Sequence, residues 1–144
     1  DESNIKVTDL KQLSKITQEE SYNITKEMIK EHPNLKAIWI QTSNIYQGVI
    51  KAIKDEKKEK DILLVFFDAE PKFLELIPKD IILASGMQQP YLMGKTALLK
   101  MDNYLNSMEV EKNLQLPILL ISKENIKEKL SIIRQNVLGI ETND

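Results

Sequence analysis

Three apolar runs, each followed directly by polar residues, constrain the fold of this chain more than any other feature of its sequence. The runs cover residues 35–40, 62–67 and 81–85. The first is followed by Gln-Thr-Ser-Asn, the second by an aspartate and the third by Gly-Met-Gln-Gln-Pro. If the runs are parallel strands, their carboxyl ends lie along one edge of a sheet, where open α/β sheets bind ligands. The pattern therefore predicts a binding surface for a small polar molecule and not a reaction centre.

Segments with helical features alternate with these runs along the chain. We expect helices at residues 18–31, 44–58, 71–76 and 90–107, a last helix capped by Ser122, and further strands at residues 5–7 and 117–121. Strands that alternate with helices imply βαβ crossovers. The sequence therefore predicts an α/β fold: a three-layer α/β/α lobe with a mainly parallel sheet. No linker divides the chain, so residues 1–144 are treated as a single α/β lobe.

The sequence also predicts how several residues pack. The run at residues 62–67 is apolar at every position, which indicates burial on both faces of the sheet. Trp39 lies within a strand and is expected in the core. Gly48 lies inside a helix at a cost of about 1 kcal/mol relative to alanine, which indicates close packing of that helix against the sheet.

Composition excludes several classes of function. The net charge is −2, from 20 basic and 22 acidic residues, so no basic surplus is available to bind nucleic acid. The absence of cysteine excludes disulfides and thiolate metal sites. The sequence contains no GxGxxG, P-loop, nucleophile elbow or His-based metal spacing. We therefore expect no catalytic residue, no metal site and no cofactor, and His32, in a turn before a proline, receives no catalytic role.

Four stretches of this sequence together resemble the carboxyl-terminal half of type I periplasmic binding proteins, and the ribose-binding group most of all. They are residues 37–48, 65–68, 87–94 and 117–126, and their order and spacing are more specific than any one of them. The resemblance implies two α/β lobes joined by a hinge that close over a sugar or similar solute. It also implies an extracytoplasmic location and delivery of the ligand to a membrane transporter or receptor.

In that family an Asn after one strand, an Asp after the next strand and a Gln before a proline bind the ligand hydroxyls. The matching positions here are Thr42, Asp68 and Gln88. Thr42 departs from the usual Asn, and Ser43 departs from the Asp that commonly follows it, so the substrate need not be ribose. A carboxylate accepts hydrogen bonds from two neighbouring hydroxyls, and a glutamine amide both donates and accepts.

Structural interpretations of the same residues stay open at this point. Asp68 is equally suited to cap the next helix, and Gln88 to satisfy backbone groups in a loop. Ser43 or Asn44 is expected to cap the helix that follows. Tyr46 and Tyr91 lie near the predicted edge, where partial burial beside the core is favoured over stacking on a ligand.

The resemblance runs from about Ile5 to about Glu128, which is less than the full carboxyl-terminal lobe of the family. That lobe begins with a strand and helix that belong before Ile5, next to the strand expected at residues 5–7. Without them, strands would face an unfilled gap with unpaired backbone groups and exposed apolar faces. We therefore expect one of three situations. The missing part is cleaved away or is a separate chain, another copy of the chain supplies a strand by swapping, or residues 1–15 rearrange to fill the gap. The polar first residues show no signal peptide, so one was removed or the chain begins inside a longer one.

Three functions remain to be distinguished. The first is a solute-binding lobe that binds a sugar or similar polyhydroxylated ligand for ABC-type uptake or sensing. The second is an interaction module that presents a ligand signal to a membrane receptor such as a histidine kinase. The third is the effector domain of a sugar-responsive transcriptional repressor, which requires an upstream DNA-binding segment.

Overall fold

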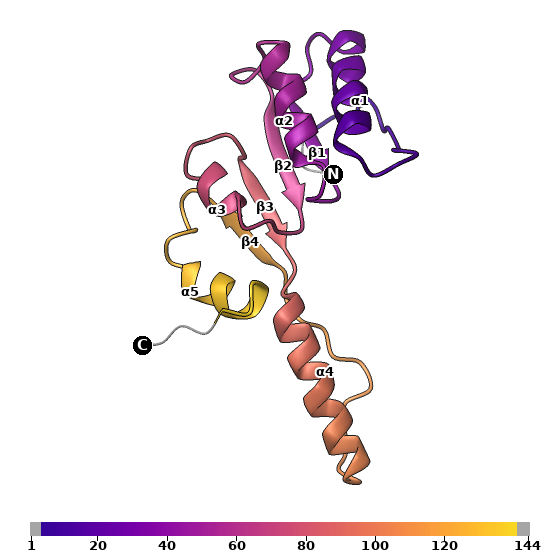
Figure 1. The fold of residues 1–144 in the computed structure, drawn as a ribbon, viewed down its shortest axis with the longest axis vertical. Helices are drawn as coiled ribbons and strands as arrows, with labels where there is room; N and C mark the ends of the chain where they lie inside the picture. Colours follow the sequence, from indigo (N-terminus) through magenta and orange to yellow (C-terminus); the bar gives the residue numbers. More distant parts are fainter. Residues whose placement is uncertain (1–3, 141–144) are drawn as a thin grey trace.

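Four short strands form one sheet in the computed structural model, which describes residues 4–140 (Figure 1). Their bounds are β1 Ala37–Ile40, β2 Leu63–Phe67, β3 Ala84–Met87 and β4 Leu119–Ser122. The strands follow one another across the sheet in chain order. The pairs β1–β2 and β2–β3 are parallel and β3–β4 is antiparallel, so the expected α/β fold with a mainly parallel sheet is confirmed.

The reversed direction of β4 has a simple cause. A parallel strand requires a crossover connection that brings the chain back to the end of the sheet at which the preceding strand began. Here the chain leaves β3, runs outward through a long helix and comes straight back, so it re-enters the sheet at the edge it left (Figure 1). The expectation that every strand-to-strand connection is a βαβ crossover is therefore wrong for this last connection.

Helical segments connect the strands. They are α1 Gln18–Glu31, α2 Tyr46–Asp55, α3 Phe73–Leu76, α4 Pro90–Leu105, α5 Leu130–Ile132 and a π-helical turn, η1 Ile133–Val137. Thr17 caps α1 by accepting a hydrogen bond from the Glu20 amide at 3.2 Å. The single helix expected after Ser122 is wrong: turns occupy the stretch before α5, and Ser122 Oγ donates to the Glu124 side chain instead of capping a helix.

The hydrophobic core lies on one face of the sheet. Ile38, Leu64, Phe66 and Ile121 point into it. Helices α1, α2, α3 and the turn η1 supply further core residues, among them Ile29, Val49, Ile53, Phe73, Ile133 and Val137. Of the three expected layers, the described residues therefore form two, a sheet and one layer of helices.

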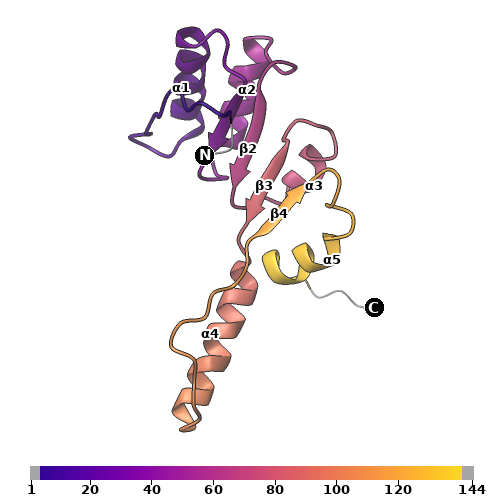
Figure 2. The same cartoon turned by 180° about the vertical axis from the view of Figure 1, so that it is seen from behind.

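The opposite face of the sheet is exposed. Trp39 is 60% exposed, Leu63 52% and Leu120 62%. Figure 2 shows β2, β3 and β4 from this side. Burial of residues 62–67 on both faces and a core position for Trp39 are therefore both wrong, because strand side chains alternate between the faces and only one face has a helix layer.

Two strand assignments also require correction. Residues 5–7 form no strand: Ile5 and Val7 are 82% and 80% exposed, and within residues 4–140 nothing pairs with the outer edge of β1. The third strand begins at Ala84 and not at residue 81, because Ile81 and Ile82 still turn back onto the Leu76 carbonyl at the end of α3.

Gly48 is required by the packing of α2 against α1. A Cβ at this position lies 2.1 Å from the Gln18 carbonyl oxygen and 2.2 Å from Ser21 Oγ. The close packing expected from the sequence is present, although the neighbour is a helix and not the sheet.

Gly48→Ala is expected to lower the free energy of unfolding by about 2–3 kcal/mol, because the backbone of α1 has to move away. Chemical denaturation measures this. Gly94→Ala is the matched control, because nothing lies within 4 Å of a Cβ there; that exposed helical site gains up to about 1 kcal/mol. Equal effects at the two glycines would contradict the packing explanation.

Candidate functional site

Thr42, Asp68 and Gln88 follow the carboxyl ends of β1, β2 and β3. These three strands are parallel and adjacent (Figure 1), so the residues that follow their carboxyl ends lie along the same edge of the sheet. Thr42 and Asp68 are partly buried and Gln88 is exposed. We call this edge, defined by the three residues, the rim. It brings together a hydroxyl, a carboxylate and a carboxamide, which are suitable partners for the hydroxyl groups of a sugar.

Asp68 has an unusual backbone conformation. Its φ is +82°, in a region that residues other than glycine rarely adopt. Two hydrogen bonds to β3 hold it there: its amide donates to the Gly86 carbonyl at 2.9 Å, and Ser85 Oγ donates to its carbonyl at 2.6 Å. The bounds of α3 rule out the capping role, because the residue before that helix is Lys72 and it has no side-chain cap. Asp68 is therefore a partly buried residue at the rim that does not cap α3.

Asp68→Gly is expected to raise the free energy of unfolding by about 1 kcal/mol, because glycine adopts positive φ without a Cβ penalty. Thermal or urea unfolding measures the change. Asp68→Ala keeps the Cβ and is the control, with no gain expected. A loss of stability in the glycine variant would show that the aspartate side chain holds the fold together and is not free for a ligand.

The start of α2 is capped differently from the expectation. The residue before α2 is Ile45, and neither Ser43 nor Asn44 donates or accepts a capping side-chain bond. Gln18 of α1 takes this role: its Nε2 donates to the Asn44 carbonyl and its Oε1 accepts from the Gly48 amide at 2.7 Å. Ser43 is buried and donates from Oγ to Glu70 at 3.0 Å, so it joins the loops after β1 and β2.

The two adjacent glutamines have different environments. Gln88 is exposed, whereas Gln89 is 3% exposed. Gln89 Nε2 donates to the Pro117 carbonyl at 2.7 Å, and its Oε1 accepts from Asn136 Nδ2 at 2.8 Å. The satisfaction of backbone groups considered for Gln88 is thus the role of its neighbour. The structural role of Gln89 was not predicted from the sequence, because no local pattern shows which of two consecutive glutamines is buried.

Both tyrosines near the rim are engaged elsewhere. Tyr46 is partly buried and packs edge-on against Phe73, with ring centroids 5.6 Å apart, as favoured from the sequence. Tyr91 is 45% exposed and lies beside Gly139, which has a φ of +67°. Its ring belongs to a hollow of about 90 Å³ whose lining includes Lys95, Gln135 and Gly139. None of the residues that line this hollow is a rim residue.

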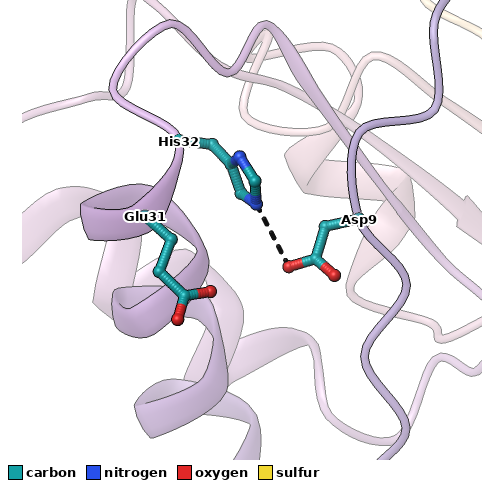
Figure 3. A group of neighbouring side chains, drawn as sticks. All are labelled: Asp9, Glu31 and His32. Atoms are coloured by element: carbon teal, nitrogen blue, oxygen red, sulfur yellow. Dashed lines mark hydrogen bonds and ion pairs between the residues drawn. The ribbon is translucent and has the colours of Figure 1, made fainter.

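A second group of polar side chains lies at the end of α1, away from the rim. His32 and Asp9 form a hydrogen bond of 3.2 Å, and Glu31 lies beside them (Figure 3). Lys11 Nζ is 2.9 Å from Glu31 and 3.6 Å from Asp9 Oδ2, so a cation already occupies this cluster. Desolvation raises the pKa of Asp9, but hydrogen bonds from His32 and Leu10 and the Lys11 charge outweigh it and leave that pKa below its usual value. The cluster attaches the amino-terminal segment to α1.

Comparison with known proteins defines the class of this chain. A model of the periplasmic binding protein domain matches residues 1–109. The chain therefore belongs to the periplasmic binding protein family, and its α/β fold agrees with that membership.

The individual relatives include proteins named for sugar import or transport. The chain is 27% identical over 110 residues to the ribose import binding protein RbsB of Bacillus subtilis, which covers 76% of this chain and 35% of that relative. An ABC sugar transporter subunit from Rhodobacter sphaeroides matches with a TM-score of 0.70 and 27% identity, over 81% of this chain and 43% of its own. A protein in the XylFII-LytSN complex has the same fold, with a TM-score of 0.64 and 18% identity over 76% and 38% of the two chains.

The chain thus spans about a third of the length of the curated relative that it matches. The relatives are named as solute-binding proteins and not as enzymes. Within the described residues, no helix combines the length and the apolar character needed to cross a membrane.

Proposed function

We propose that this chain is a lobe of an extracytoplasmic solute-binding protein and that its rim binds a sugar or similar polyhydroxylated ligand. The observation that carries the proposal is the alignment of Thr42, Asp68 and Gln88 at the carboxyl ends of three adjacent parallel strands. The family supports it, since the curated relatives are named as ribose import binding proteins. Asp68 is the anchor, because an ionised carboxylate forms charge-assisted hydrogen bonds with hydroxyls.

The rim supplies one wall of a cleft, and we propose that further polypeptide supplies the other. This is the amino-terminal lobe of a longer or cleaved protein, a separate chain, or another copy. The unpaired outer edge of β1 is where the strand and helix absent from this lobe would add. Affinity for a small solute is accordingly weak in the isolated chain.

Delivery to an ABC-type membrane transporter is the favoured role, because the relatives include an import binding protein and a transporter subunit. Presentation of the bound ligand to a membrane receptor such as a histidine kinase is the second candidate, supported by the shared fold of a protein solved in the XylFII-LytSN complex. Nothing in the described structure favours the third hypothesis, the effector domain of a sugar-responsive repressor.

A thermal-shift series with single sugars tests the ligand proposal. Ribose, xylose, galactose, glucose and allose are each added up to about 100 mM to the wild-type chain and to Asp68→Ala. A sugar at ten times its dissociation constant adds about 1.4 kcal/mol of stability by mass action. Sugars also stabilise proteins through exclusion from the surface, and the variant measures that contribution.

The proposal predicts that at least one sugar stabilises the wild type more than Asp68→Ala, with saturation. Identical, unsaturated shifts in both proteins for every sugar would reject sugar binding at the rim. Sucrose serves as the control for surface exclusion, because it stabilises folded proteins without a specific site.

A further inference from the structure

Asp68 differs from the other residues of the described chain that have a positive φ without being glycine. Lys57, Asp80 and Ser107 lie in the turns that follow α2, α3 and α4, where a left-handed residue is common. Asp68 instead follows directly on β2. A residue other than glycine keeps such a conformation only where its surroundings hold it, and residues of this kind cluster at ligand-binding and catalytic sites. The groups that hold Asp68 are therefore candidates for a role at the rim.

Two buried serines flank the segment that carries Asp68. The sheet order places β2 between β1 and β3. Ser43, which follows β1, is 2% exposed, and Ser85, which lies in β3, is 0% exposed. Their hydroxyls donate to Glu70 Oε1 and to the Asp68 carbonyl respectively. Residues 68–70 are thus held from both sides by side chains that are shielded from water.

The contacts with β3 fix the backbone of Asp68. Its amide donates to the Gly86 carbonyl, and its carbonyl accepts from Ser85 Oγ. A rotation of Asp68 to negative φ moves its carbonyl relative to its amide, so at least one of these two bonds would lengthen or break. Ser85 therefore opposes the relaxation that the strained φ favours.

The contact with the segment after β1 fixes the loop from the other side. Glu70 is partly buried, and within the described residues it forms no ion pair. Lys72, the nearest lysine in the sequence, is bound to Glu75 at 2.6 Å instead. The bond of 3.0 Å from Ser43 to Glu70 thus ties the residue next to Thr42 to the loop that carries Asp68.

We propose that two serines and one glutamate are positioning residues of the rim. Ser85 holds Asp68 in its left-handed conformation, and the bond between Ser43 and Glu70 sets the distance between the segments of Thr42 and Asp68. None of the three is itself a rim residue, and each acts on a ligand through Asp68 or Thr42. This inference rests on the proposed function, because the geometry of the rim matters only if the rim binds a ligand.

A set of matched variants tests the two contacts. Ser85→Ala removes the bond on the β3 side, and Glu70→Ala removes the bond on the β1 side. Glu70→Gln keeps an oxygen that accepts from Ser43 and is the conservative rescue. Ser21→Ala is the control, because Ser21 is also 2% exposed and donates to the Gln18 carbonyl at 2.9 Å, but lies in α1. Since Glu70 is only partly buried, its variants remain usable if Ser85→Ala does not fold.

Amide NMR titration with ribose, xylose, galactose, glucose and allose, at a temperature where the variants are folded, gives the dissociation constants. For a sugar that binds the wild type, the constant is expected to rise about fivefold in Ser85→Ala and in Glu70→Ala, the effect of about one hydrogen bond. It is expected to stay within about twofold in Glu70→Gln and Ser21→Ala, although Ser21→Ala also lowers the melting temperature. Unchanged affinity in Ser85→Ala or Glu70→Ala, or an equal loss in Ser21→Ala, would overturn the proposal.

The conformation of Asp68 is measured without a ligand. A positive φ brings the amide proton of a residue close to its own Hα, which gives a strong nuclear Overhauser cross-peak between the two. This cross-peak is expected for Asp68 in the wild type and in Ser21→Ala, and it is expected to weaken in Ser85→Ala. A cross-peak that stays strong in Ser85→Ala would overturn the proposal whether or not a sugar binds. A weakened cross-peak without sugar binding to the wild type would reject the proposed function and still support the positioning of Asp68 by Ser85.

Discussion

Gln89→Ala is expected to lower the free energy of unfolding by about 1–3 kcal/mol, although the residue is next to the rim residue Gln88. Its side chain is 3% exposed and bonds both the Pro117 carbonyl and the Asn136 amide. The alanine variant removes both hydrogen bonds, which are partly buried, and a typical hydrogen bond contributes about 0.5–1.5 kcal/mol net. Urea denaturation followed by circular dichroism measures the loss.

Gln88→Ala is the matched control, because it makes the same chemical change one residue earlier on an exposed side chain. We expect it to change stability by less than about 0.5 kcal/mol and to weaken the sugar-dependent thermal shift. If Gln88→Ala and Gln89→Ala lowered the free energy of unfolding equally, the assignment of a structural role to Gln89 and of a ligand-binding role to Gln88 would be wrong.

Phe73→Ala is expected to cost about 3–5 kcal/mol, the usual range for removing a buried phenylalanine ring. Phe73 is 0% exposed, and its ring centroid lies 5.0 Å from that of Phe66 and 5.6 Å from that of Tyr46. Helix α3 is only four residues long, and Phe73 is its one buried side chain. The change should therefore also loosen the loop that carries Asp68.

Two control variants accompany Phe73→Ala in urea denaturation. Phe73→Leu keeps much of the buried volume and is expected to lose clearly less stability. Lys72→Ala, one residue earlier on the surface, is expected to lose less than about 0.5 kcal/mol. A Phe73→Ala variant as stable as wild type would mean that α3 is not anchored by the core, and the position of Asp68 would then need another explanation.

Much of the fold follows from hydrophobic periodicity. The helix expected at residues 18–31 has those bounds in the structure, and the apolar runs at 35–40 and 62–67 contain β1 and β2. The order of the polar clusters also places Thr42, Asp68 and Gln88 at one edge. Local pattern is sufficient from β1 to β3 because each of these strands is joined to the next by a crossover through one helix.

The sequence fails where tertiary context decides. A run such as residues 62–67 has the same letters whether one face is covered or two, so the exposure of Leu63 was not predictable from pattern alone. The outward path of α4 reverses β4, and that reversal depends on where the helix packs and not on its periodicity. The cap of α2 comes from Gln18, 26 residues before the Asn44 carbonyl that it bonds, and no local signal marks such a contact.

The site is predictable only in part for the same reason. Residue type and strand ends indicate Asp68 as a candidate, but its positive φ accompanies hydrogen bonds with β3 that no local pattern predicts. The structural role of Gln89 depends on Pro117 and Asn136, which are distant in sequence.

Amide NMR of the isotope-labelled chain during titration with the sugar that gives the largest thermal shift, or with D-ribose if none does, tests the central claim most directly. The account predicts saturable shift changes concentrated at residues 42–43, 68–70 and 86–88, and their loss in Asp68→Ala. Chemical-shift changes confined to helix α4 or to the cluster around His32 would contradict the assignment of the rim as the ligand-binding wall. The absence of any shift change at about 100 mM sugar would contradict it as well.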